Sequence, residues 1–118
     1  MRLALYRTEP GRFELNALCE GKGSITRNGD QFEFKGVDVS QRGLGCLIRG
    51  NVHQGDIIVL RFPKKEIQFN IQWIESHLGI DGIFRVGLTP TDRHLDILQF
   101  MLQLGYTENK TTGVKTAS

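Results

Sequence analysis

The amino-acid sequence predicts an all-β protein, a closed or nearly closed antiparallel β-barrel followed by one C-terminal α-helix. Apolar side chains recur at every second position through most of the chain, which is the period of a strand with one buried face. Turn-forming residues divide the chain into roughly six or seven short strands at spacings of about 8–12 residues. The period becomes that of a helix only near the C-terminus, and this order favours a barrel.

The first strands are expected in the N-terminal third of the chain. Residues 13–19 place Phe, Leu, Ala and Cys at alternating positions and predict one strand. Phe32 and Phe34 alternate with polar neighbours and predict another. The pair Asn28-Gly29 just before them is a strong signal for a tight hairpin between two strands.

Four more strands follow in the middle of the chain. They are expected over residues 44–48, 57–62, 67–73 and 83–88. Gly-Asn and Gly-Asp pairs lie between the first two, and an Asp-Gly pair precedes the last. The third of them alternates most regularly. One of its faces carries Ile67, Phe69, Ile71 and Trp73, and the other carries only Gln and Asn. We therefore expect all four apolar side chains, including Trp73, to lie in the core.

The C-terminal part of the chain predicts a helix and then a tail. The segment 89–92 indicates a helix start, because Thr91 can cap the helix and Asp92 suits the positive end of its dipole. One helical face carries Leu95, Leu98, Met101 and Leu102. Gly105 is the expected stop. Residues 1–106 thus form one domain, and the polar stretch 107–118 is expected to be disordered.

Ile97, Phe100 and Leu104 widen the apolar arc of this helix beyond one stripe. Two interpretations remain open. The three side chains can pack against a protein partner or against a second copy of the chain. In the second case the protein would be a homodimer rather than a monomer. Alternatively, they cover the end of the barrel and nothing more.

Composition limits the function classes. The apolar fraction of 39% and the charged fraction of 24% are ordinary for a soluble domain. No apolar run approaches a membrane span, and the N-terminus lacks an apolar signal segment, so a cytoplasmic location is expected. The net charge of +2 is too small to indicate nucleic-acid binding, and no DNA partner is expected. Cys19 and Cys46 occupy alternating apolar positions without metal spacing, which favours buried, inert thiols.

No pattern indicates catalysis. His53, His77 and His94 have no Cys or His neighbour at metal-ligand spacing. Nucleophile elbows, phosphate-binding Gly-rich loops and zinc-protease motifs are absent from the sequence. We therefore expect a protein that is not an enzyme and that carries no cofactor or metal.

The most informative motif is Asp38-x-Ser40-x-x-Gly43. An Asp and a Ser two residues apart on a strand point to the same side. Gly43 then permits a backbone turn or a close approach by a ligand. The simpler interpretation is a turn that ends a strand, stabilised by the Asp or Ser side chain.

This motif, followed by an apolar strand, resembles the (D/N)xSxxG signature of the PilZ family. The resemblance extends from about residue 12 to residue 104. Its further elements are the Gly55-Asp56 turn before a strand, a later strand ending in Trp73, the run Phe84-Arg85-Val86-Gly87-Leu88, and the apolar helix. It implies a six-stranded antiparallel barrel of Greek-key-like, split-barrel type with a C-terminal helix. It also implies binding of the bacterial second messenger cyclic di-GMP.

In the family, an RxxxR motif before the first barrel strand holds phosphates and guanine edges. The matching residues here are Arg7 and Arg12, with four residues between them instead of three. The resemblance thus implies a site of Arg7, Arg12, Asp38 and Ser40, with Gly43 in the motif and Arg42 as a third candidate cation. Arginine suits this ligand, because its planar fork binds phosphate, bonds guanine O6 and N7, or stacks on a base.

Three functional hypotheses follow. The chain is a cyclic di-GMP receptor that relays the messenger to a protein partner, or a barrel of the same type that binds proteins but not the messenger. The altered spacing of the arginines is the sequence feature that distinguishes these two hypotheses. A third hypothesis, an unrelated barrel for single-stranded nucleic acid, requires exposed aromatic side chains beside basic ones. The core-like alternation of Phe32, Phe34, Phe69 and Trp73 argues against it.

Overall fold

The computed structural model describes residues 11–108. Its elements in chain order are β1 (Phe13–Glu14), β2 (Glu20–Ile25), β3 (Gln31–Val39), β4 (Leu44–Arg49), β5 (Ile57–Phe62), β6 (Lys65–Ser76), β7 (Ile83–Pro90) and α2 (Ile97–Gln103). Within this range no helix is long and apolar enough to cross a membrane.

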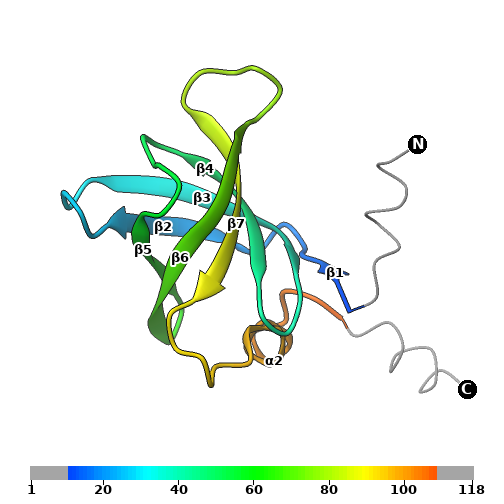
Figure 1. Cartoon of the computed structure of the whole chain (residues 1–118). Helices are drawn as coiled ribbons and strands as arrows, with labels where there is room; N and C mark the ends of the chain where they lie inside the picture. Colours follow the sequence, from blue (N-terminus) through cyan, green and yellow to red (C-terminus); the bar gives the residue numbers. More distant parts are fainter. Residues whose placement is uncertain (1–10, 109–118) are drawn as a thin grey trace, which may run out of the picture.

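Six of the strands form a closed antiparallel barrel, as the sequence predicts. Each strand pairs with the next in the order β2, β3, β4, β7, β6, β5, and β5 pairs with β2 to complete the circle. The short β1 lies along the same edge of β3 as β2 does, with Phe13 opposite Val39 and Glu14 opposite Asp38. Figure 1 shows the long β6 and β7 crossing the front of the barrel, with α2 at its lower end.

The single strand expected over residues 13–19 is wrong, because the chain turns in its middle. The side-chain oxygen of Asn16 accepts a hydrogen bond from the amide of Leu18. The amide groups of Asn16 meanwhile donate to the carbonyls of Tyr106 and Gly105. Asn16 therefore replaces ladder bonds with a turn, as short polar side chains commonly do. The strand resumes after Cys19.

Strand β2 was missed by the sequence analysis, because its glycines conceal the alternation. Gly21 lies opposite Phe34 and Gly23 lies opposite Phe32 on β3. A Cβ atom on Gly23 would lie 2.8 Å from the Phe32 ring and 2.5 Å from the carbonyl oxygen of Val59. The aromatic rings thus occupy the space that side chains of β2 would otherwise fill.

A β-bulge at Val37 changes the face on which β3 presents its side chains. Phe32, Phe34 and Gly36 are buried before it, and Val39 is buried after it. The extra residue reverses the inward and outward alternation, because side chains in a strand have a period of two. Asp38, which is in phase with the buried Phe residues by sequence, therefore points away from the core.

A second bulge, at Gln72, does the same in β6. Ile71 is buried and faces Leu88, whereas the next pair across the strands is Trp73 and Gly87. Trp73 is 44% exposed, so its predicted place in the core is wrong. The regular alternation of residues 67–73 could not reveal a bulge between its last two apolar members.

Both cysteines are in the core, as expected. Cys19 and Cys46 are fully buried, and both are free thiols. Burial raises the pKa of Cys19 to about 12 and also raises that of Cys46. Neither thiol is therefore ionised near neutral pH, which fits a packing role.

The helix begins five residues later than the expected Asp92 start. Asp96 is its N-cap, and its side chain accepts a hydrogen bond from the amide of Gln99. Thr91 instead donates its amide to the carbonyl of Gln68, so the chain still follows the barrel there. The expected stop is confirmed. Gly105 has a φ of 78°, and its amide and the next one bond back into the last turn.

The helix α2 covers the end of the barrel, and the apolar side chains of its wide arc take part in this packing. Ile97 and Met101 are fully buried. Phe100 packs edge-to-face on Phe62, with ring centroids 5.4 Å apart, and Leu104 packs partly buried against the core. Ile97 therefore has no surface to offer a protein partner, and the expectation that it takes part in such an interface is corrected.

The packed part of the chain also reaches beyond the expected boundary at residue 106. Thr107 is only 7% exposed, and its hydroxyl donates to the carbonyl of Glu14 across 2.6 Å. The start of the expected disordered tail is thus corrected to a later residue. Its remainder, residues 109–118, lies outside the described residues.

The glycine–aromatic pairs of β2 predict a graded loss of stability. Gly23→Ala places a methyl group against a backbone carbonyl, so we expect the free energy of unfolding to fall by about 1–3 kcal/mol. Gly21→Ala is the matched control, because its closest contact is 3.2 Å from the Phe34 ring. Urea denaturation of both variants measures the difference. Equal losses at the two positions would contradict the packing argument.

Candidate functional site

Four residues form a row across the outer face of the barrel. Asp38 on β3 is opposite Gly45 on β4, Gly45 is opposite Gly87 on β7, and Gly87 is opposite Trp73 on β6. The two bulges bring the outer members of this row to the surface. The two central glycines have no side chain, so the outer members have room to lean toward each other.

The outer side chains do lean over the glycines. A Cβ atom on Gly45 would collide with the carboxylate of Asp38, and one on Gly87 would collide with the indole ring of Trp73. Both glycines are buried although they face outward, because these side chains cover them. Any larger residue in either place would displace the carboxylate or the ring.

Two arginines converge on Asp38. Arg12 Nη2 lies 2.7 Å from Asp38 Oδ1, and Arg85 Nη2 lies 3.6 Å from Asp38 Oδ2. All three side chains are partly exposed, at 29%, 36% and 24% for Arg12, Arg85 and Asp38. The Nε of Arg85 is buried and has no hydrogen-bond partner among the described residues. A buried donor without a partner is uncommon in folded proteins.

These groups line an open groove of about 600 Å³, which we call the Asp38 groove. Its charged and aromatic lining consists of Arg12, Asp38, Glu75, Arg85 and Trp73. The charges in it balance, because two arginines face two carboxylates. The groove can therefore supply cations to a phosphate, carboxylates to amide-like donors, and an aromatic face.

The structure brings together three of the six residues singled out by the sequence. Arg12, Asp38 and Gly43 line the Asp38 groove. Ser40 and Arg42 lie in the adjoining hairpin turn and not in the groove lining, while Arg7 lies outside the described residues.

Ser40 does not act as a strand residue beside Asp38, because β3 ends at Val39. The amide of Ser40 donates to the carbonyl of Gly43 across 2.8 Å and closes the β3–β4 turn. Arg42 is exposed at the tip of this turn. The turn is also fixed to the helix, since the carbonyl of Gln41 accepts a hydrogen bond from the amide of Ile97.

Sequence analysis missed Arg85 and Trp73 as groove residues. Arg85 and Gly87 alternate with the buried Val86, so an outward face of β7 was visible in the sequence. What the sequence could not show is the strand register that sets them beside Asp38. Trp73 was concealed by the bulge at Gln72.

A second groove, of about 550 Å³, crosses the outer faces of β2, β3 and β4. Its lining includes Lys22, Glu33, Lys35 and Arg49. Lys22 and Arg49 flank Glu33 from the two neighbouring strands. Cations and acids thus alternate across the strands, as on an ordinary solvated face. We do not assign a ligand to it.

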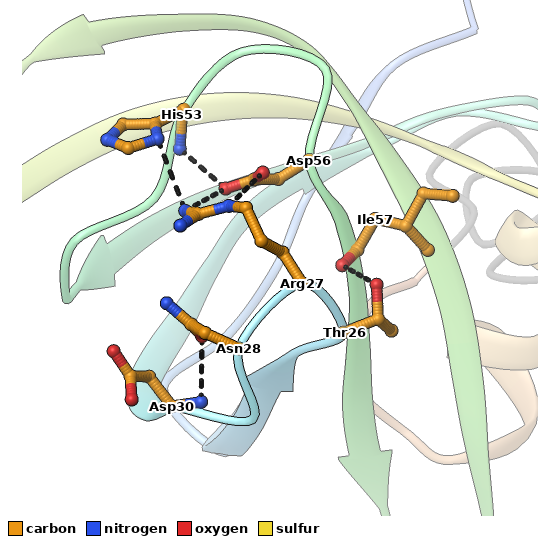
Figure 2. A network of polar contacts seen from close by, with 7 residues as sticks. All are labelled: Thr26, Arg27, Asn28, Asp30, His53, Asp56 and Ile57. Atoms are coloured by element: carbon orange, nitrogen blue, oxygen red, sulfur yellow. Dashed lines mark hydrogen bonds and ion pairs between the residues drawn. The ribbon is translucent and has the colours of Figure 1, made fainter.

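The densest polar network lies elsewhere and joins two turns. Figure 2 shows the guanidinium of Arg27, in the β2–β3 turn, forked over the carboxylate of Asp56 in the β4–β5 loop. Both nitrogen–oxygen distances are 3.0 Å. The amide of His53 donates to the same carboxylate, and Arg27 Nη2 lies 3.2 Å from His53 Nδ1. These groups satisfy one another, so the network is structural.

The charge of Asp56 is stabilised by this network. Hydrogen bonding to Arg27 lowers the pKa of Asp56, and the amide of His53 lowers it further. Hydrogen bonding to Asp56 raises the pKa of Arg27 in turn. Among the described residues, no group of three or more His, Cys, Asp or Glu side chains could hold a metal ion.

Comparison with known proteins does not identify the chain. No family model matches it, and neither the curated proteins nor the solved structures include a significant match.

The lowered pKa of Asp56 predicts a pH-dependent stabilisation. The contribution is complete above the pKa of an unfolded Asp, about 3.9, and is lost as the pH falls through the lower pKa of the folded state. Asp56→Asn should therefore lower the free energy of unfolding at pH 7, and this difference from the unaltered protein should shrink below about pH 4. Denaturation at several pH values measures it.

Glu66→Gln is the matched control, because Glu66 pairs with Arg61 at 3.5 Å in an exposed position. That pair should contribute about 0–1 kcal/mol. A pH-independent loss in Asp56→Asn would show that shape rather than charge makes Asp56 stabilising.

Proposed function

We propose that this protein is a cyclic di-GMP receptor, which binds the messenger in the Asp38 groove and relays its level to a protein partner in the cytoplasm. The observation that carries the proposal is the convergence of Arg12 and Arg85 on the outward carboxylate of Asp38. The motif around Asp38 led to the same ligand by resemblance, and the geometry adds a second arginine to that motif.

The groups in the groove match the chemistry of this ligand. Cyclic di-GMP carries two phosphate charges and two guanine bases. A guanine base presents N–H donors that a carboxylate such as Asp38 can accept, and O6 and N7 acceptors that suit an arginine fork. Arg85, whose side chain is 36% exposed, provides one such fork. Arg12 provides a second.

Binding requires Arg12 to exchange its partner, and the exchange is energetically reasonable. Breaking the Arg12–Asp38 pair removes one charge-assisted hydrogen bond of 2.7 Å. Each charge-assisted hydrogen bond contributes roughly 1.5–3 kcal/mol. A dianion that draws Arg12 onto a phosphate, and frees Asp38 for a base, forms two such bonds for the one that is broken.

The same contacts suggest how binding is relayed. Strand β1, which follows Arg12, is bonded to the end of the described chain through Glu14 and Thr107. The β3–β4 turn is bonded to the start of α2 through Gln41 and Ile97. A ligand that moves Arg12 or the turn therefore acts on both ends of the α2 segment, whose exposed side would face a partner.

The second candidate is a protein-interaction module that does not bind the messenger. The observation that favours it is the balance of charge in the groove, where Asp38 already satisfies Arg12. A site for a dianion commonly presents excess positive charge. Arg7, the residue that could supply it, lies outside the described part of the chain.

Isothermal titration calorimetry with cyclic di-GMP tests the proposal. We expect saturable binding, weakened about tenfold or more in Arg12→Ala and in Asp38→Ala, because each loses a charge-assisted contact. Arg49→Ala is the matched control, since Arg49 is 70% exposed and does not line the Asp38 groove. It should bind normally. Absence of binding heat with the unaltered protein at high ligand concentration would contradict the receptor proposal and favour the protein-interaction module.

A further inference from the structure

Trp73 lies flat on the barrel wall beside the arginines of the Asp38 groove. The position of a Cβ atom on Gly87 is crowded by three consecutive atoms of the five-membered ring, Cδ1, Nε1 and Cε2. One face of the indole is therefore against the backbone of β7. The side chain is nevertheless 44% exposed, so the opposite face is open to the groove.

We propose that Trp73 is a stacking platform for a purine base of the ligand. This inference rests on the proposed function and adds a residue outside the motif that suggested it. A ring fixed on one side by backbone and open on the other offers a preformed surface for a planar base. Such stacking contributes binding energy with any base, because every base has a π-face.

The surroundings of Trp73 favour a nucleotide base over a purely apolar group. Arg85 lies two residues before Gly87 on the same face of β7, and it lines the Asp38 groove together with Trp73. An apolar partner would leave this cation and the carboxylate of Glu75, opposite it on β6, without solvent. A base with polar edges, joined to a phosphate, can stack on the indole and satisfy the arginine.

A structural role alone does not account for the bulge that presents this ring. The contact with Gly87 uses only the face of the indole that lies against β7. If Gln72 were paired in a regular ladder, Trp73 would continue the inward series of Ile67, Phe69 and Ile71 and be buried. The bulge instead moves a large apolar side chain into a groove that also contains two arginines and two carboxylates.

The test compares Trp73→Leu with Trp73→Phe by calorimetry with cyclic di-GMP. Loss of a stacked base should weaken binding roughly 5- to 100-fold in Trp73→Leu, whereas Trp73→Phe should retain most of the affinity. Trp73 is the single tryptophan of the chain, so its emission should also change saturably on titration of the unaltered protein. Leu78→Ala is the control, because Leu78 is 81% exposed and does not line the groove.

Gly87→Ala provides a second variant that keeps the indole but displaces it from β7. It should weaken binding in the same direction, with melting temperatures recorded for all variants to confirm that they fold. Normal binding by Trp73→Leu, together with loss of binding by Asp38→Ala, would overturn the stacking inference and keep the proposed function. Absence of binding by the unaltered protein would overturn both.

Discussion

The candidate site depends on two β-bulges, at Val37 in β3 and Gln72 in β6. Each inserts one residue and thereby reverses which side chains face the core. Asp38 and Trp73 are brought to the surface, and the next residues, Val39 and Ile74, turn back toward the interior. Without the first bulge a carboxylate would point into an apolar core, at a large cost in solvation. The barrel can therefore carry this groove only because its alternation is broken twice.

Much of the barrel was predictable, because burial imposes its period directly on the sequence. Strands β4, β5 and β7 match the expected ranges closely, since each is a short apolar run preceded or followed by a glycine turn. Strand β2 was not predictable, because it has glycines where apolar side chains would show the alternation. Aromatic rings from β3 occupy the space beside these glycines. The helix start was misplaced for a similar reason. Thr91 is a suitable cap by sequence, but it bonds to Gln68, which lies far away in the chain.

The candidate site was less predictable than the fold. The motif around Asp38 is local in the sequence and could be located. It forms a turn that ends β3, as the simpler interpretation expects, but a backbone hydrogen bond from Ser40 to Gly43 closes the turn instead of a side chain. The partners of Asp38 are not local. Arg85 reaches it through the pairing of β4 with β7. Contacts of this kind depend on strand register, which a single sequence specifies only through the complete fold.

The contacts that hold the N-terminal segment also have a consequence for the order of folding. Asn16 and Gly105 are 89 residues apart in the chain, and Glu14 and Thr107 are 93 apart. During synthesis from the N-terminus, β1 can pair with β3 early, but these two contacts form only after α2 has emerged. The groove is complete once β6 and β7 bring Trp73 and Arg85 to the face that carries Asp38. The N-terminal segment is fully fixed only after that, when Gly105 and Thr107 have followed.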